Sequence, residues 1–140
     1  MKNCSLVIIL SLIIAVSACK KENRLESKLE GTWELRHLIG FVPPDRKGDR
    51  PPGNGDIYTF KGNNFERLMG GIIIDSGTFL VLNDISNYNE KLQFKLVLDG
   101  DKYDSSIPFK MTGEKLVLHF GALASDGAIE TYARLSHTSK

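Results

Sequence analysis

Apolar and polar residues alternate along most of this chain, which is the pattern of β-strands that bury one face. The alternation is clearest in residues 92–98, where leucine and phenylalanine take the even positions and mostly polar residues the odd ones. Residues 72–82 are compatible with two strands or with one bulged strand, and the sequence leaves that choice open. The predicted strands are residues 29–41, 57–61, 65–69, one or two within 72–82, 92–98, 103–111, 116–120 and 129–135.

These segments predict an all-β fold, because glycine, asparagine and aspartate separate them and no helical period occurs after the first residues. About eight strands joined by local turns favour an antiparallel up-and-down β-barrel over a sandwich with long crossovers. We place this single domain at residues 29–137, preceded by a signal helix and a flexible tether. A chain of 140 residues can bury enough apolar surface for one such domain.

The strand at residues 29–41 organises the predicted barrel. Its odd positions from Trp33 to Phe41 are apolar apart from His37, so these positions are expected to face the core. Trp33 is the only tryptophan and follows Gly31, which leaves room for a neighbouring ring. We therefore predict that Trp33 anchors the barrel floor. An inward His37 is more often a hydrogen-bonded core residue than a ligand, but in a hollow barrel it could line the cavity.

The next segment, residues 43–56, is expected to be a loop without regular structure. Its four prolines and three glycines remove backbone donors and permit positive φ. It is longer than a hairpin needs, and loops of this length are often lids or inserts. A harmless surface excursion is an equal alternative to a lid.

Residues 1–18 have the three zones of an export signal, with Lys2 in the positive region, an apolar run over residues 6–16, and small residues before Cys19. The run is shorter than the about 20 residues of a membrane span. Residues 19–28 form a polar tether, in which a short helical turn near Leu29 is possible. Cys4 is lost with the signal, so Cys19 is the last thiol and a disulfide is excluded.

The tetrapeptide Val16-Ser17-Ala18-Cys19 resembles the lipobox of bacterial lipoproteins. The resemblance implies a lipidated Cys19, which would attach the protein to the membrane bilayer. It further implies a location in the cell envelope, with the outer membrane favoured because Lys20 is not the aspartate that tends to mark inner-membrane retention. Acylation by more than one chain gives the firm anchoring that a single chain lacks.

The segment Gly31-Thr32-Trp33 resembles the Gly-x-Trp signature that opens the first strand of lipocalins, and more closely the bacterial lipocalin-like lipoproteins of the Bacteroidetes type. Residues 76–79 and 114–118 are similar to two later strand motifs of those proteins. In lipocalins a basic residue near the barrel's end packs across the signature tryptophan, and the resemblance assigns that role to Arg134. The Thr-Asp-Tyr motif of lipocalins has no counterpart here.

Charge and motifs exclude several classes of function. Only Lys2 among the charged residues lies in residues 1–18, so the remaining chain is formally neutral, which disfavours nucleic-acid binding. The three histidines have no metal-ligand spacing, so we expect no metal and no cofactor. Neither serine nor paired carboxylates stand in a catalytic motif, and the protein is not expected to be an enzyme.

Two functions remain, and oligomeric state is open in both. The first is a carrier that holds a small apolar or amphipathic molecule in the barrel, under a lid formed by residues 43–55. The second is a filled barrel that acts as a structural or protein-binding module of the envelope. In the carrier, the expected cavity residues are Leu35, His37, Phe60, Phe79, Phe94 and Phe109.

Overall fold

The structure is a computed structural model of the chain, and it describes residues 23–83, 92, 94–99, 106–121 and 126–135. The predicted signal at residues 1–18 and Cys19 lie outside these residues. The helix α2 (Asn23–Leu29) occupies the part of the predicted tether next to the barrel, where the sequence allows a helical turn. Among the described residues, no helix is long and apolar enough to cross a membrane.

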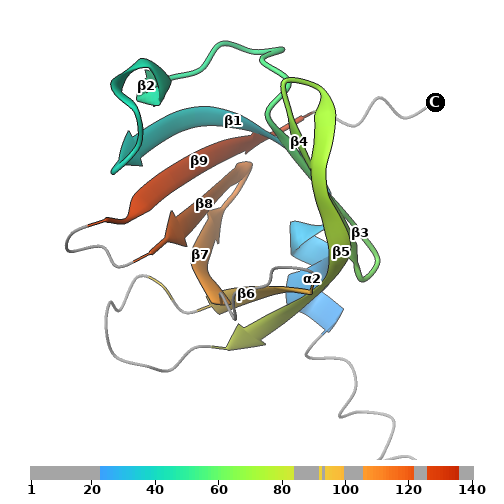
Figure 1. Cartoon of the computed structure of the whole chain (residues 1–140). Helices are drawn as coiled ribbons and strands as arrows, with labels where there is room; N and C mark the ends of the chain where they lie inside the picture. The colour runs from blue at the N-terminus through green and yellow to red at the C-terminus, as the bar shows by residue number, and fades with distance from the viewer. Residues whose placement is uncertain (1–22, 84–91, 93, 100–105, 122–125, 136–140) are drawn as a thin grey trace, which may run out of the picture.

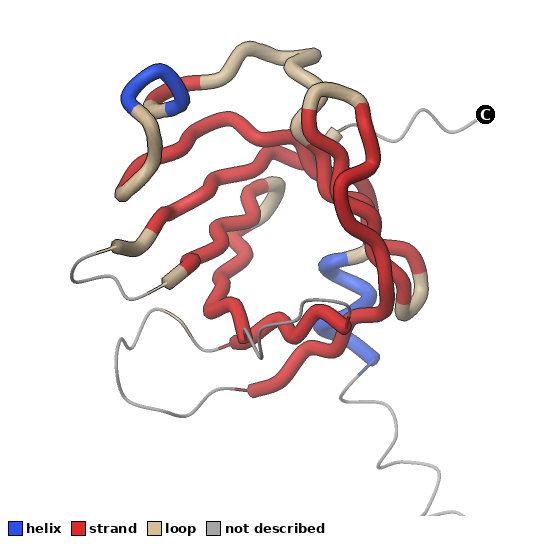
Figure 2. Tube along the Cα trace, viewed as in Figure 1, coloured by secondary structure: helices blue, strands red, loops and turns tan. Residues whose placement is uncertain are grey.

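The strands form one antiparallel sheet in the order β2-β1-β3-β4-β5-β6-β7-β8-β9, and pairing of β1 with β9 closes it into a barrel (Figure 1). Each of the eight longer strands pairs with the next along the chain, which confirms the predicted up-and-down barrel. Figure 2 shows these strands as the wall and the short helical segments at its ends. The strands are β1 (Gly31–Gly40), β2 (Gly48–Asp49), β3 (Ile57–Lys61), β4 (Asn64–Met69), β5 (Ile72–Asn83), β6 (Phe94–Asp99), β7 (Ser106–Thr112), β8 (Lys115–Phe120) and β9 (Ala128–Arg134).

Residues 72–83 form one bulged strand rather than two. Arg67 on β4 pairs with Asp75 on β5, but the next residue, Leu68, pairs with Ile73. Ile74 is therefore an extra residue in β5, and the ladder continues on both sides of it. The bulge lets a single strand of 12 residues bend around the barrel.

A second bulge lies in β1 and reverses its inward face. Leu35 pairs with Tyr132 on β9, and His37 pairs with the adjacent residue of β9, so Arg36 is the extra residue. Beyond this point Leu38 is 2% exposed, whereas Ile39 is 43% exposed. The prediction that the odd positions face the core up to Phe41 is thus wrong after Leu35, because one added residue shifts the period-two pattern by one.

The barrel interior at the end where β1 begins is filled by apolar side chains. The rings of Phe60 and Phe79 pack edge to face with centroids 5.1 Å apart, and those of Phe94 and Phe109 lie 5.7 Å apart. The buried core comprises Leu29, Trp33, Leu35, Tyr58, Phe60, Phe65, Phe79, Leu96, Leu98, Ile107, Phe109, Leu116, Leu118 and Tyr132.

The same end is closed by α2 and by residues of the first and last strands, and we call it the floor. Trp33 is fully buried and donates its indole N–H to the Leu29 carbonyl at the end of α2, at 2.7 Å. The Arg134 guanidinium carbon lies 4.1 Å from the Trp33 ring centroid, inside the reach of a cation–π contact. Arg134 also donates to the carbonyls of Lys28 and Glu30. Helix, first strand and last strand therefore meet at one tryptophan.

Candidate functional site

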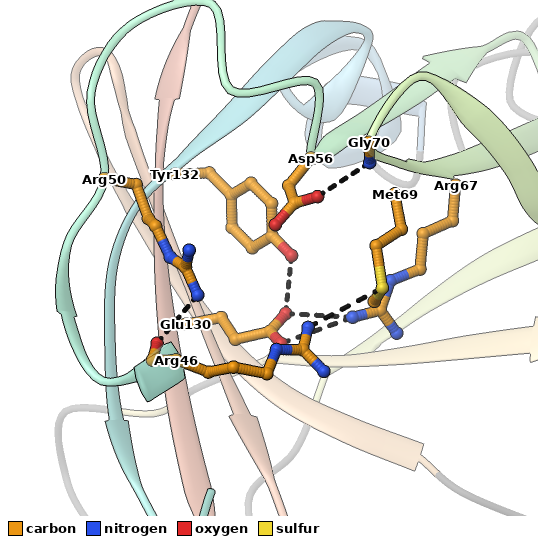
Figure 3. Close-up of polar contacts among 8 residues, drawn as sticks. All are labelled: Arg46, Arg50, Asp56, Arg67, Met69, Gly70, Glu130 and Tyr132. Atoms are coloured by element: carbon orange, nitrogen blue, oxygen red, sulfur yellow. Dashed lines mark hydrogen bonds and ion pairs between the residues drawn. The ribbon is translucent and has the colours of Figure 1, made fainter. Parts of the chain in front are cut away.

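A cluster of polar and aromatic side chains lies inside the opposite end of the barrel, where β1 ends and residues 41–56 begin, and we call this the loop end. Arg67 of β4 and Glu130 of β9 face inward from opposite walls, and Arg67 Nη2 lies 3.3 Å and 3.5 Å from the two carboxylate oxygens of Glu130. The Tyr132 hydroxyl donates to Glu130 Oε2 at 2.5 Å. Figure 3 shows these side chains pointing toward one another.

The Arg67 guanidinium lies between two aromatic rings. Its carbon is 5.1 Å from the centroid of Tyr58 and 5.7 Å from that of Phe120, within cation–π range of both. The Arg67 side chain is 24% exposed although it points into the barrel. Water therefore reaches the interior from the loop end as far as this residue.

The electrostatics of the cluster keep the arginine charged and the phenols neutral. Burial raises the pKa of Tyr58 and of Tyr132 far above the usual range of a phenol, and the positive charge of Arg67 offsets only part of this. Burial acts to lower the pKa of Arg67, but Tyr58 and Glu130 raise it, and the net direction is upward. The site therefore presents a permanent cation to anything that enters from the loop end.

Residues 41–56 are tied to β1 along their second half. Gly53 donates its backbone N–H to the Glu34 carboxylate at 2.7 Å, and Asn54 donates its side-chain amide to the Leu35 carbonyl at 2.7 Å. Glu34 is 2% exposed and forms an ion pair with Arg36. These contacts explain why a glutamate on the outer face of β1 is buried, since this part of the loop covers it.

The first half of this loop is more regular than predicted. It contains a short 3-10 helix, Pro44–Arg46, and the two residues of β2, which pair with His37 and Leu38 of β1. The expectation of a segment without regular structure is wrong for these two pieces. Proline at the start of the 3-10 helix supplies a suitable φ, and backbone pairing with β1 holds Gly48 and Asp49.

Two arginines of this half come close to the cluster (Figure 3). Arg46 Nη2 donates to the thioether sulfur of Met69 on β4 at 3.6 Å. Arg50 Nη2 donates to the Arg46 carbonyl at 2.9 Å, and Arg50 Nε is buried without a hydrogen-bond partner among the described residues. The contact with Met69 places the Arg46 side chain between the loop and the opposite wall.

The residues predicted to line a cavity separate into two groups. Leu35, Phe60, Phe79 and Phe109 are at most 5% exposed, and Phe94 packs against them. These five belong to the packed core. His37 lies on the outer face because of the bulge at Arg36, with its side chain 41% exposed and its Nδ1 2.6 Å from Asp49 Oδ1. The expectation that His37 faces inward is therefore wrong.

The predicted floor residues do come together, whereas sequence analysis missed the cluster at the loop end. Gly31 is buried with a φ of 133°, next to Trp33, which Arg134 covers. A signal for the cluster was present. Arg67 lies in phase with the inward Phe65 and Met69, and Glu130 lies in phase with Tyr132, so each charge falls on a buried face.

The grooves on the outside of the barrel are weaker candidates for a binding site. Two adjoining open grooves, of about 530 Å³ and 720 Å³, lie outside the barrel beside β3 and share Glu30, Thr59 and Lys61. The carboxylate that both grooves share is engaged, because Glu30 Oε1 accepts the Gly62 backbone N–H at 3.3 Å. Among the described residues, no three histidine, cysteine or acidic side chains are placed to hold a metal ion.

Comparison of the chain with protein-family models, with curated proteins and with solved structures finds no match. The closed antiparallel barrel is consistent with a lipocalin-like fold.

Proposed function

We propose that this protein is a lipid-anchored lipocalin-like barrel of the bacterial cell envelope that binds one small amphipathic molecule at its loop end. The observation that carries the proposal is the ion pair of Arg67 and Glu130 inside the barrel, in which Glu130 is buried and the Arg67 side chain is still 24% exposed to water. Burying charged groups costs free energy of folding unless they are well paired, so a charged pair inside a barrel points to a function. On this proposal the cluster binds its ligand and catalyses no reaction.

The packed floor restricts the ligand. Because Phe60, Phe79 and Phe109 fill the interior near the floor, a long apolar chain has no room there. A ligand held at the loop end would contact the partly buried ring of Phe120 with its apolar part and the charged cluster with its polar part. A small number of polar groups on an aromatic wall is the usual composition of such sites.

Ligand binding is tested with the chain from residue 19 carrying Cys19→Ala and a short-chain fluorescent amphiphile. We expect saturable binding, followed by fluorescence anisotropy. Met69→Trp should weaken it, because Met69 faces the interior next to Arg46. Leu68→Trp is the matched control, since the neighbouring position faces outward on the same strand. Absence of binding, or equal loss in both variants, would refute a site at the loop end.

The anchor is supported by Val16-Ser17-Ala18-Cys19 and by the family that the sequence resembles. In cells that lipidate exported proteins, Cys19→Ala in the full chain should abolish incorporation of labelled fatty acid and partitioning into detergent. A labelled, membrane-bound variant would contradict the anchor but would leave the ligand proposal standing.

A protein-binding module is the second candidate, favoured by one observation. The outer face of β5 exposes Ile73, Leu80 and Leu82, and Ile74 at the bulge and Ile72 at the start of the strand are exposed as well, each by 43% to 71% of its surface. Exposed apolar patches of this kind often mark contact surfaces. If no amphiphile binds and polar substitutions on this face abolish association with an envelope protein, this second function replaces the first.

A further inference from the structure

We infer that the polar part of the ligand is an anion, of the carboxylate or sulfate type, and that it binds between Arg46 of the loop and Arg67 of β4. The inference rests on the proposed ligand function and specifies its chemistry. At the loop end, the acidic side chains that the structure describes already have hydrogen-bond partners, whereas the basic side chains keep free donors, and the inference follows from this difference.

The carboxylates nearest the site are already engaged. Glu130 accepts from Tyr132 and from Arg67, and Asp56 Oδ1 accepts the backbone N–H of Gly70 at 3.0 Å. Asp75 faces Arg67 across the β4–β5 ladder, so Arg67 also has a negative neighbour on that side. An incoming cation would compete with Arg67 and Arg46 for these same groups.

Arg46, like Arg50, has no carboxylate partner among the described residues. The acceptor that the structure gives its guanidinium is the Met69 sulfur at 3.6 Å. A thioether is a weak acceptor, whereas a guanidinium presents several strong N–H donors in a planar fork suited to a carboxylate. The half-buried Arg46 therefore keeps donors for an anion.

Arg67 also has bonding capacity left. Its contacts to Glu130, at 3.3 Å and 3.5 Å, are longer than the about 2.7–2.9 Å of a strong charge-assisted hydrogen bond. An anion placed between the two arginines would gain hydrogen bonds from both while the Arg67–Glu130 contact changes little. The partly buried ring of Phe120 beside Arg67 would then contact the apolar part of the ligand.

Arg50 acts as a positioning residue for Arg46. It donates to the Arg46 carbonyl at the end of the 3-10 helix, which fixes the backbone from which the Arg46 side chain extends. Its buried Nε has no partner among the described residues and adds positive charge beneath the loop. The site would therefore combine one cation of the loop, Arg46, with one cation of the barrel wall, Arg67.

The test compares three molecules with the same chain and different head groups, namely octanoate, 1-octanol and octylammonium, by isothermal titration with the chain from residue 19 carrying Cys19→Ala. We expect octanoate to bind at least about tenfold more tightly than octanol, since a hydrogen bond to a charged group contributes at least that factor. Raising the salt concentration should weaken octanoate binding and leave octanol binding unchanged.

Arg46→Ala should reduce the octanoate preference, because one of the two cations is lost, and should weaken octanol binding much less, because the octanol head group carries no charge. Lys47→Ala is the matched control, since Lys47 is the neighbouring exposed cation of the same loop, and it should leave both affinities unchanged. Thermal unfolding of both variants checks that the barrel is intact. Arg67 is left in place because its removal would leave Glu130 without its cation.

Each outcome decides the question. Equal affinity for octanoate and octanol, or equal weakening of both by Arg46→Ala, overturns the anion inference and leaves the ligand proposal standing. If octylammonium binds most tightly of the three, the anion inference is wrong and the ligand carries a cation that binds the carboxylates of the cluster. Binding of none of the three removes the proposed function together with this inference.

Discussion

Replacing Trp33 with alanine should remove much of the free energy of unfolding, because its buried ring makes two specific contacts at the floor, with Leu29 and with Arg134. The side chain is fully buried, donates to the Leu29 carbonyl at 2.7 Å and is covered by the Arg134 guanidinium at 4.1 Å. Arg134 in turn donates to the carbonyls of Lys28 and Glu30. The substitution therefore acts on α2, β1 and β9 together.

The expected magnitude follows from three contributions. Truncating a buried tryptophan to alanine costs about 3–5 kcal/mol through lost burial and the cavity that remains. The cation–π contact is worth about 0.5–2 kcal/mol, and a buried carbonyl without its donor costs about 1–3 kcal/mol. Because these contributions share the same atoms they do not add fully, and we expect about 4 kcal/mol in total. A domain of this size is typically stable by only about 5–15 kcal/mol.

Urea unfolding followed by circular dichroism is the appropriate measurement, because Trp33 is the only tryptophan and its removal also removes the fluorescence probe. Ile39→Ala is the matched control on the same strand, since Ile39 is 43% exposed beyond the bulge and should change stability by less than about 1 kcal/mol. A cost for Trp33→Ala no larger than that of Ile39→Ala would refute the assignment of the floor.

Three further predictions concern other parts of the barrel. Gly77→Ala should lower the urea midpoint, with a cost of about 1–3 kcal/mol, because an added Cβ would lie 2.1 Å from the Asp99 carbonyl oxygen on the neighbouring strand; an unchanged midpoint would contradict the close approach of β5 and β6. Glu34→Ala should speed protease cleavage within residues 50–54, because the backbone N–H of Gly53 loses its acceptor, and unchanged cleavage would show that other contacts hold the loop. Burial lowers the pKa of His119 below its usual 6.5, so on acidification the unfolded chain binds a proton at this histidine before the folded protein does. The free energy of unfolding should therefore fall as the pH drops below about 6.5. A pKa of His119 at or above 6.5, measured by NMR titration of the folded protein, would contradict this.

The strands could be predicted from sequence because their alternation is local, but the register could not. Residues 94–98 alternate in the same phase throughout, and the structure places β6 there. In β1 the alternation continues through His37, yet the pairing with β9 inserts Arg36 as an extra residue. A bulge depends on the partner strand and on barrel curvature, which period-two reasoning along one strand does not contain. The placement of His37 failed for this reason.

The candidate site was only partly accessible from sequence for a related reason. The inward phase of Arg67 and of Glu130 can be read from their neighbours, but their meeting cannot, since 63 residues separate them. Trp33 and Arg134 were paired in the sequence analysis only through a family resemblance, and the structure places them 4.1 Å apart. The contact of Arg46 with Met69 depends on the path of the loop in the folded protein. The prolines restrict the backbone of this loop, but they do not predict where it runs.

The polar groups at the floor have hydrogen-bond partners within the protein, whereas some of those at the loop end have none among the described residues. This difference favours the loop end as the place where a ligand binds. At the floor, Arg134 bonds two carbonyls, the Glu114 carboxylate and an aromatic face, so its donors are engaged by the protein itself. At the loop end, Arg46 contacts a weak sulfur acceptor and Arg50 keeps an unpartnered buried N–H among the described residues. β1 and β9 pair through their backbones from Trp33 and Arg134 at the floor to Gly40 and Ala128 at the loop end, so closure of the barrel does not depend on the side chain of Arg46. Binding at the loop end could therefore rearrange Arg46 without opening the sheet, and an anion is the partner that would satisfy its remaining donors.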